Sequence, residues 1–445
     1  MLFKNQKGII IIIYDIIIKG DCMNIMEIVL KKQIGKILKE EEISYVVNNY
    51  TNNIINDSDM TLFLKAICKK GMTDKETIYL TKAMLNSGPI LDLSMIDGVK
   101  VDKHSTGGVG DKTTLIVAPI VAACNVYIAK MSGRALGFTG GTIDKLESIK
   151  GFKVNLSKDE FIRELIDIKM AVTSQTEDIA IADKKIYALR DITDTVSSIP
   201  LIASSIMSKK LATGADIIVL DVKVGNGALM NNLHDAKLLA KLMIKIGKSF
   251  NKKIIAVISN MNEPLGHNIG NALEVEEAIK ILNNNGDEDL KTLCKELATN
   301  MIMLAKSIPH KDAMQEVEEV LKSRKAYQKF LEFIKYQGGE LFLPKANNKT
   351  IINSLETGYV ESINSKLLGE YVMSLGAGRK NKTDQIDYTV GIKVIKKIGD
   401  YASKDEPIFE IYSNKLDIPI FPLNDIVNIN NKLVEKEPII IKIIK

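Results

Sequence analysis

The sequence predicts an α/β protein that carries a separate all-α domain and a small C-terminal α+β module rich in strands. Apolar residues recur every three or four positions over residues 24–87 and 182–212, which indicates helices. Between residues 88 and 335, strand-like apolar runs alternate with helical segments, a pattern typical of a large domain with a mostly parallel or mixed sheet. From about residue 345, short alternating strands with glycine turns replace that pattern.

These patterns divide the chain into parts. The predicted parts are a helical domain (23–87 and 182–212), an α/β domain (88–181 and 213–335) and the C-terminal module (345–445). Residues 1–22 are interpreted as an extension, with Met23 as an alternative start. Their apolar run is interrupted by Asp15, lacks a small-residue cleavage site and is too short to cross a bilayer.

Composition excludes several classes of protein. The 445 residues carry a net charge of only +5, 5% aromatic residues and no tryptophan, which argues against a nucleic-acid surface. No later segment reaches about 18 uninterrupted apolar residues, so we expect no membrane span. Cys22, Cys68, Cys124 and Cys294 form no C-x-x-C pair, which favours a reducing cytoplasm over a disulfide framework or zinc site.

A first glycine-rich loop lies in KHSTGGVGDKTT, residues 103–114, between a predicted strand (VKVD) and a predicted helix (113–124). Its glycines let the backbone approach a ligand, and the helix N-terminus favours an anion. Lysine and hydroxyl groups accompany them: Lys103, Ser105, Thr113 and Thr114. The loop is not a Walker A motif, because Asp111 and Thr106 stand where that motif needs glycine. The alternative is a strand–helix turn that binds nothing.

A second glycine-rich loop, KMSGRALGFTGGTIDKLES, covers residues 130–148 and also connects a predicted strand to a predicted helix. It offers Lys130, Ser132 and Thr142. Two such loops at the carboxyl ends of successive parallel strands converge on one crevice. Together they predict an oxyanion site, most simply a phosphate site.

A third segment, YALRDITDTVSSIPLIASSIMSKK, predicts a helix that begins near Pro200. Ser205 and Lys209 are four residues apart and share a helix face, with Arg190 on the preceding stretch. These side chains suit a flat ring that carries carbonyl groups. The alternative is a solvated basic face, and Ile202 and Ile206 fit either a pocket wall or the core.

His104 is one of four histidines and stands beside Lys103. An imidazole can give or take a proton at neutral pH, so His104 is a candidate acid or base. A structural role is the alternative. His234, His267 and His310 receive no role.

At this point the motifs resemble those of a known family. KHSTGGVGDKTT, KMSGRALGFTGGTIDKLES, YALRDIT, SIPLIASSIMSKK, DVKVGNGA, GNALEVEEAI and LGAGR resemble the pyrimidine nucleoside phosphorylase and thymidine phosphorylase family, over about residues 24–415. The resemblance implies a helical domain and an α/β domain that close over a cleft, in a homodimer joined through the helical domain. It implies reversible phosphorolysis of a pyrimidine (deoxy)nucleoside to free base and (deoxy)ribose 1-phosphate.

The resemblance also implies roles for individual residues. Inorganic phosphate, the co-substrate, would be held by Lys103, Ser105, Thr114, Lys130, Met131, Ser132 and Thr142. The base would be held by Arg190, Ser205 and Lys209, with Leu136, Ile202 and Ile206 as apolar walls. The catalytic residues would be His104, as general acid, with Arg190 and Lys209. No organic cofactor is implied, but a potassium ion would lie near Gly110, Lys112, Leu265, Asn268 and Glu277.

Departures from the family pattern leave alternatives open. Ala135 and Phe138 alter the second loop without removing a proposed ligand, and Lys112 is an awkward side chain beside a cation. Leu229 replaces the phenylalanine of thymidine-specific members, which favours the broader type that takes uridine, thymidine and deoxyuridine. The alternatives are a thymidine-specific enzyme, an anthranilate-type phosphoribosyltransferase that would need magnesium, and an inactive nucleoside-binding protein.

Overall fold

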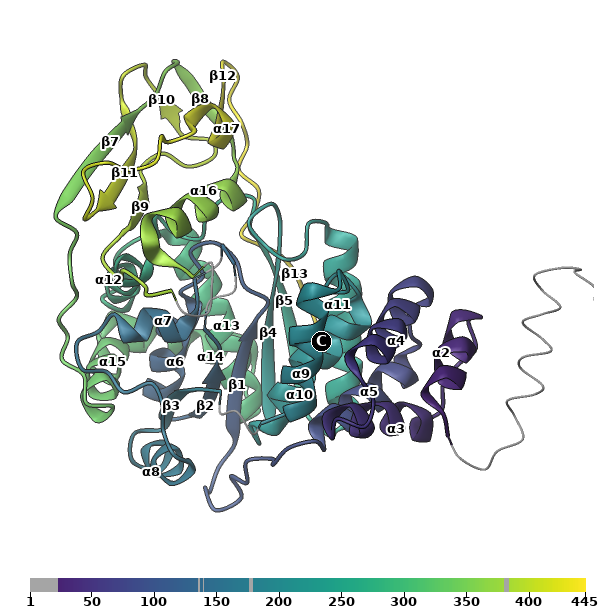
Figure 1. Cartoon of the computed structure of the whole chain (residues 1–445). Helices are drawn as coiled ribbons and strands as arrows, with labels where there is room; N and C mark the ends of the chain where they lie inside the picture. The colour runs from purple at the N-terminus through teal and green to yellow at the C-terminus, as the bar shows by residue number, and fades with distance from the viewer. Residues whose placement is uncertain (1–22, 135–136, 139, 176–178, 380–383) are drawn as a thin grey trace, which may run out of the picture. The chain divides into compact units, whose positions relative to one another are not determined.

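The computed structural model describes residues 23–134, 137–138, 140–175, 179–379 and 384–445. The predicted extension (1–22), Ala135 and the predicted wall residue Leu136 lie outside the described residues. The chain forms two compact units, whose elements are labelled in Figure 1. The helical unit comprises the chain up to Ile90, Glu177–Ala212 and Lys245–Phe250. The larger unit comprises the rest. No helix in these described ranges has the length and apolar character needed to cross a membrane.

Three helices of the helical unit begin at polar caps. The side chains of Asn24, Asn56 and Thr73 each accept a hydrogen bond from a backbone N–H in the first turn of the following helix. The helices of this unit are α2 (Ile25–Gln33), α3 (Glu40–Thr51), α4 (Asp57–Lys70), α5 (Asp74–Leu85), α9 (Ile181–Ile192) and α10 (Ile199–Ala212). Their apolar faces form one core, which includes Val29, Phe63 and Leu201.

One ion pair is buried inside this helical unit. The ammonium of Lys32 lies 2.7 Å from Oε1 of Glu76, and both side chains are almost fully buried. The Glu76 carboxylate also accepts hydrogen bonds from the backbone N–H groups of Leu38 and Thr73. Burial alone would raise the pKa of Glu76, but these bonds and Lys32 lower it below its ordinary value. The pair therefore joins α2, the α2–α3 loop and α5.

The larger unit is built on a six-stranded sheet with the order β13-β5-β4-β1-β2-β3. Its strands are β1 (Lys100–Ser105), β2 (Tyr127–Ser132), β3 (Met170–Ser174), β4 (Ile217–Val224), β5 (Lys253–Asn260) and β13 (Ile440–Ile444). All neighbours are parallel except β13, which runs antiparallel to β5. This confirms the predicted mostly parallel sheet. Strand order changes direction at β1 and β4, the position where ligands bind in open α/β sheets.

Helices cover this sheet in layers. They are α6 (Thr113–Ala123), α7 (Thr142–Glu147), α8 (Lys158–Ile168), α11 (Leu233–Ser249), α12 (Asn271–Leu282), α13 (Glu288–Lys306), α14 (His310–Lys322) and α15 (Lys325–Tyr336). Helices α6 and α13 pack on the strands, while α12, α14 and α15 pack against α6 (Figure 1). Helix α6 is apolar nearly all round and almost wholly buried, as a helix between two layers must be.

Strand β1 is longer than the sequence pattern predicts. The predicted strand ends at Asp102, whereas β1 continues to Ser105 and pairs there with Asp221 of β4. Lys103, His104 and Ser105 therefore lie on the strand and not on the glycine loop. The physical reason is the partner strand: β4 is buried along its whole length and supplies hydrogen bonds to residues of low strand propensity.

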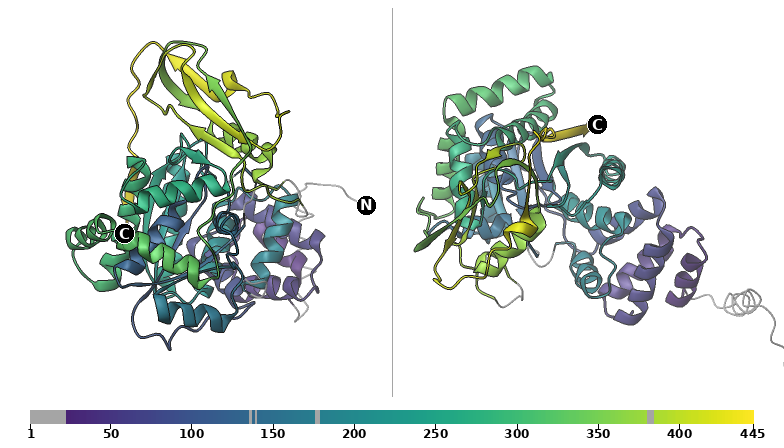
Figure 2. Two further views of the ribbon diagram at one scale, coloured as in Figure 1. Left: turned by 90° about the vertical axis from the view of Figure 1, so that its left-hand side faces the viewer. Right: turned by 90° about the horizontal axis from the view of Figure 1, so that it is seen from above.

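The C-terminal module contains two small antiparallel sheets, with orders β10-β8-β12 and β6-β9-β11-β7. Its elements are β6 (Asn268–Ile269), β7 (Asn348–Asn353), β8 (Gly358–Ile363), α16 (Ser365–Val372), η1 (Met373–Ala377), β9 (Gly391–Val394), β10 (Tyr401–Ala402), β11 (Pro407–Ser413), α17 (Leu423–Ile426) and β12 (Val427–Asn430). The predicted module boundary needs two corrections. β6 comes from the α/β segment, and β13 leaves the module to extend the large sheet, where Figure 2 shows it apart from the other yellow strands. Both corrections reflect pairing between strands distant in sequence.

We predict that Glu76→Ala lowers the free energy of unfolding of the helical unit by about 3–5 kcal/mol, because it leaves the Lys32 ammonium buried without a counter-charge. Since the folded pKa of Glu76 is lowered, the native pair contributes above the unfolded-state pKa of about 4.3, and its contribution disappears as the pH falls through the folded pKa. Urea unfolding followed by circular dichroism at several pH values measures both effects.

The matched control is Glu40→Ala, which breaks an exposed pair with Lys82 in the same unit. We expect a much smaller loss there, because exposed pairs are screened by water. Equal losses in the two variants would contradict the role assigned to the buried pair.

Candidate active site

Buried charges gather where β1 and β4 end. The Lys103 side chain is 1% exposed, donates to the hydroxyl of Thr113 and lies 3.7 Å from the Asp221 carboxylate. Lys223 is fully buried, and its ammonium lies 2.9 Å from the same Asp221. Ser259 on β5 donates to Asp221 at 2.6 Å. The carboxylate of Asp221 therefore holds charged groups from two neighbouring strands in place.

Asp111 fixes the first glycine loop against this group. Its carboxylate accepts from the backbone N–H of Thr113 at 3.2 Å and from the Thr113 hydroxyl at 2.6 Å. Burial alone would raise the pKa of Asp111, but the positive charges of Lys223, Lys103 and Lys145 hold it well below its usual range. Asp111 is therefore an anion that binds the start of α6 to three lysines.

Lys145 on α7 joins the two glycine loops. Its ammonium donates to the carbonyl of Asp111 at 2.6 Å and to that of Gly140 at 3.2 Å. It also pairs with Glu274 of α12 at 2.8 Å, and the side chain of Lys145 is fully buried. The predicted convergence of the two loops is thus present as direct contact within the larger unit.

The proposed phosphate ligands of the second loop occupy equivalent places on β2. The pairing between β1 and β2 ends at Val101 and Ile128, and Lys103 and Lys130 each stand two residues further along. Lys130 is 4% exposed, and its ammonium donates to the carbonyl of Met131. Serines and threonines complete the set: Ser105, Ser132 and Thr142 are partly exposed and Thr114 is 7% exposed. Lysine is rarely buried in a folded protein, so these buried lysines make this sheet edge a candidate anion site.

The second loop is also held from the C-terminal side. Asp144 of α7 lies 3.1 Å from Arg134 in the loop and 3.0 Å from Arg379 in the LGAGR motif. Asn271 of α12 donates to the carbonyl of Ala377, the third residue of that motif. The late motif therefore contacts α7 of the second loop and α12.

The predicted base site lies in the helical unit. Lys209 donates to the Ser205 hydroxyl at 3.1 Å, which confirms that the two side chains share a face of α10. Lys209 also pairs with Asp183 of α9 at 2.6 Å and lies over the ring of Tyr187. Ile202 is buried beside this group on the same helix. The arrangement is a partly exposed cation held in one place, not a solvated basic face.

Arg190 makes more hydrogen bonds to the backbone than the sequence indicates. Its guanidinium donates to the carbonyls of Thr195, Val196 and Leu201, which engages three of its five N–H groups. Burial lowers its pKa, partly offset by the charge of Asp183. Arg190 thus fixes the turn between α9 and α10, and its contact with a base stays a prediction.

His104 occupies the β1 position opposite Leu220 of β4. Because side chains alternate along a strand, His104 points to the other face of the sheet from Lys103 and Ser105. It is partly exposed, whereas Lys103 is buried. His104 is therefore not a member of the buried lysine group, and its role as general acid stays a prediction.

The residues of the predicted potassium site surround the Lys112 ammonium. Lys112 Nζ donates to the carbonyls of Leu265 at 2.7 Å and Asn268 at 2.9 Å, and to Oε2 of Glu277 at 2.6 Å. Burial alone would raise the pKa of Glu277, but Lys112 holds it below its ordinary value. The Lys112 side chain, 1% exposed, therefore points away from the phosphate ligands.

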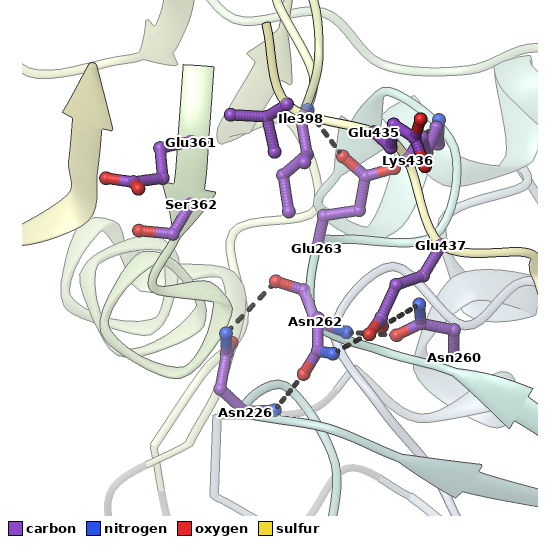
Figure 3. Close-up of a pocket in the computed structure, with 11 residues that line it drawn as sticks. Asn226, Asn260, Asn262, Glu263, Glu361, Ser362, Ile398, Glu435, Lys436 and Glu437 are labelled. Atoms are coloured by element: carbon purple, nitrogen blue, oxygen red, sulfur yellow. Dashed lines mark hydrogen bonds and ion pairs between the residues drawn. The ribbon is translucent and has the colours of Figure 1, made fainter. Parts of the chain in front are cut away.

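A cavity of about 300 Å³ lies elsewhere in the larger unit, at the seam with the C-terminal module. Figure 3 shows four carboxylates around it and one ammonium: Glu263, Glu361, Glu435, Glu437 and Lys436. Lys436 is itself paired with Glu263 and with Asp289. Glu437 accepts from Asn260 and Asn262 (Figure 3). This negative cavity is unsuited to phosphate or to an anionic base, so it is not the candidate site.

The sequence analysis missed the acidic partners of the site. They are Asp111, Asp221 and Glu274 in the larger unit and Asp183 in the helical unit. Only Asp183 gave a usable signal, because Asp183, Tyr187 and Arg190 fall at helical spacing on one face of α9. Asp111 and Glu274 act on lysines of other elements, and Asp221 pairs with Lys103 of the adjoining strand as well as with Lys223 of its own.

Comparison with known proteins agrees with this architecture. Residues 97–327 match the model of the glycosyl transferase family a/b domain, and residues 26–88 match that of its helical bundle domain. Residues 359–420 match the pyrimidine nucleoside phosphorylase C-terminal domain. A pyrimidine-nucleoside phosphorylase of Bacillus subtilis is 52% identical over 401 residues, 88% of this chain and 93% of that protein.

The chain belongs to the pyrimidine-nucleoside phosphorylase family. Family members of the same name from Geobacillus stearothermophilus and Staphylococcus epidermidis are 49% and 47% identical, over 88% and 92% of this chain and 93% and 97% of their own. The fold alone is shared with anthranilate phosphoribosyltransferase of Thermus thermophilus, with a TM-score of 0.57 and 17% identity over 69% of this chain and 98% of that one. The predicted family and fold are confirmed.

We predict that inorganic phosphate binds the larger unit and that Lys130→Met raises its Kd by about 10- to 100-fold, the loss expected for one charge-assisted hydrogen bond. Isothermal titration calorimetry measures the Kd of phosphate for each protein. Lys150→Met, which removes an exposed lysine paired with Glu340 in the same unit, is the control and should leave the Kd unchanged. The same Kd in both variants would contradict the assignment of Lys130.

Proposed function

We propose that this protein catalyses the reversible phosphorolysis of pyrimidine nucleosides to free base and pentose 1-phosphate. Family membership supports the proposal, since the curated relatives carry the name pyrimidine-nucleoside phosphorylase. The observation that carries it is the contact between the two glycine loops. Lys145 joins them, and Lys103 and Lys130 lie buried at the strand ends from which they leave. Lysines and hydroxyls at one sheet edge suit an inorganic phosphate.

In the proposed reaction, phosphate is the nucleophile that attacks the anomeric carbon of the pentose. The phosphate is bound by Lys103, Lys130 and the loop hydroxyls, which aim one of its oxygens at that carbon. The two reactants are therefore already positioned and need not meet by diffusion. Asp111 and Asp221 hold Lys103 in a fixed place, so little rearrangement of that lysine is needed when phosphate arrives. No covalent intermediate on the protein is required.

Cleavage of the glycosidic bond places negative charge on N1 and the 2-carbonyl oxygen of the departing pyrimidine. We assign Lys209 to stabilise that charge, with Arg190 and Ser205 as further base ligands. The pairs of Lys209 with Asp183 and Ser205 support this assignment, since they hold the ammonium in one place. A preorganised cation of this kind lowers the barrier without rearranging during the reaction.

His104 is assigned to protonate the departing base. Its position supports this role, because His104 lies on β1 between Lys103 and Ser105, two of the proposed phosphate ligands. An imidazole titrates near neutral pH, which suits proton transfer in either direction of a reversible reaction.

The substrate range that we propose is broad: uridine, thymidine and deoxyuridine. Leu229, which stands where thymidine-specific members tend to carry phenylalanine, supports this range. Its side chain is 49% exposed in the loop after β4. A thymidine-specific enzyme is the alternative, and the ratio of rates on uridine and thymidine decides between them.

We also propose a cytoplasmic homodimer joined through the helical unit. Apolar side chains exposed on that unit support the dimer, among them Met26, Ile34, Ile37 and Ile54. The free thiols of Cys68, Cys124 and Cys294 support a reducing compartment. Light scattering of the purified protein should give twice the mass of 49.3 kDa, and a monomer would contradict the dimer.

We predict phosphate-dependent release of free base, and a loss of about 10²- to 10⁴-fold in kcat for His104→Ala, the effect of removing a general acid. Release of uracil or thymine from each nucleoside is followed with and without phosphate. The control is His234→Ala, an exposed histidine on α11, which should keep wild-type activity. No release by the folded wild-type protein would refute the enzyme assignment, and magnesium-dependent transfer from phosphoribosyl pyrophosphate would favour the phosphoribosyltransferase alternative.

A further inference from the structure

Lys112 lies in the first glycine loop between Asp111 and Thr113, both of which belong to the buried charge network. Its own ammonium takes no part in that network. It enters a cage formed by the Leu265 carbonyl, the Asn268 carbonyl and the Glu277 carboxylate, at 2.7, 2.9 and 2.6 Å. These three acceptors match the three N–H groups of an ammonium, so its hydrogen-bonding capacity is fully used.

The cage is built by several segments of the larger unit. The Glu277 carboxylate on α12 also accepts from the backbone N–H groups of His267 and Asn268, at 2.7 and 2.9 Å. Asn268 lies on β6, which pairs with β9 of the C-terminal module. The backbone of the first loop closes on the cage, since a Cβ at Gly110 would lie 2.7 Å from the Leu265 carbonyl. The ammonium thus joins the first loop, α12 and the C-terminal module.

Two carbonyl oxygens and a carboxylate are also a donor set for a potassium ion, and the family resemblance assigns potassium to these residues. Ammonium and potassium ions have the same charge and nearly the same radius. A potassium ion at hydrogen-bond distance from all three oxygens would coincide with the Lys112 nitrogen. Two cations in one cage would also repel each other strongly, because no water screens their charges there.

We propose that the Lys112 ammonium is the resident cation of this site, so that this protein takes no potassium ion there. The chain supplies the positive charge itself, and the charge cannot dissociate. Lys112 is a positioning residue: it holds the loop whose Asp111 and Thr113 lie beside Lys103, and it does not touch phosphate. The effect on turnover rests on the proposed function, whereas the effects on cation binding and stability do not.

The first experiment uses the wild-type protein. Its melting temperature is measured in potassium chloride and in tetramethylammonium chloride at equal ionic strength, and binding of rubidium, a potassium analogue, is measured by equilibrium dialysis. We expect the same melting temperature in both salts and no rubidium retained by the cage. A melting temperature that potassium raises, or stoichiometric rubidium binding that disappears in Glu277→Gln, would overturn the proposal.

The second experiment opens the cage. Lys112→Thr removes the ammonium and leaves room and a hydroxyl, so we expect the melting temperature to fall by about 5 °C without potassium. Potassium at 100 times its Kd should restore about 4 °C, and the variant should bind one rubidium ion. Lys112→Met, the matched control, fills the volume with an apolar side chain and should lose stability without recovery in potassium.

The outcomes separate the explanations. Two results together support the proposal. Potassium must restore the melting temperature of Lys112→Thr but not of Lys112→Met, and the melting temperature of the wild type must not depend on potassium. Equal, potassium-insensitive losses in both variants would show that Lys112 contributes only packing, which overturns it. If Lys112→Thr does not fold, the wild-type measurements still decide. The rate of phosphorolysis is measured on the same proteins. We expect a lower rate for Lys112→Thr without potassium, and recovery of that rate when potassium is added. If no protein shows turnover but the stability pattern holds, the proposed function fails and the cation assignment stands.

Discussion

The site depends on one constraint: the charges of Lys103, Lys145 and Lys223, buried around the glycine loops, must be compensated by carboxylates. A buried ammonium is costly unless it is paired, and Lys103, Lys145 and Lys223 are all buried. Asp111 and Asp221 compensate these charges together with Glu274. The pairs of Lys103 with Asp221 and of Lys145 with Glu274 each join two elements, so moving these elements apart would separate charges in a low-dielectric interior. The contacts that hold Asp111 and Lys145 in place follow from this pairing and not from the glycine-rich sequence around them.

The same constraint explains how flexible residues build a fixed anion site. Glycine lets the backbone approach a ligand closely but adds conformational freedom that folding must overcome. The ion pairs offset that cost locally. Lys112 repeats the principle one residue after Asp111, where its ammonium fixes the outer side of the first loop to α12 and to β6. Ser105 and Thr114, which flank this loop, remain the proposed phosphate ligands.

The C-terminal module supports the site and does not form it. Arg379 reaches Asp144 beneath the second loop, and Asn271 donates to the Ala377 carbonyl. Strand β6 carries one wall of the Lys112 cage and belongs to the module's sheet. A module that holds both loops from outside explains why the motifs that resemble the family extend far beyond the loops themselves.

The sequence by itself determined the local elements: the helices, from apolar spacing and caps, and the two glycine loops at strand ends. It also placed Ser205 and Lys209 on one face, because helical spacing is a local property. Only the tertiary structure decided the ends of β1, the place of β13 and the partners of the lysines. Lys112 and Glu277 are 165 residues apart, and no local pattern links them. Charge pairing in the interior depends on distance in space, which periodicity does not encode. The sequence therefore could not show that the Lys112 ammonium itself occupies the cage predicted for potassium.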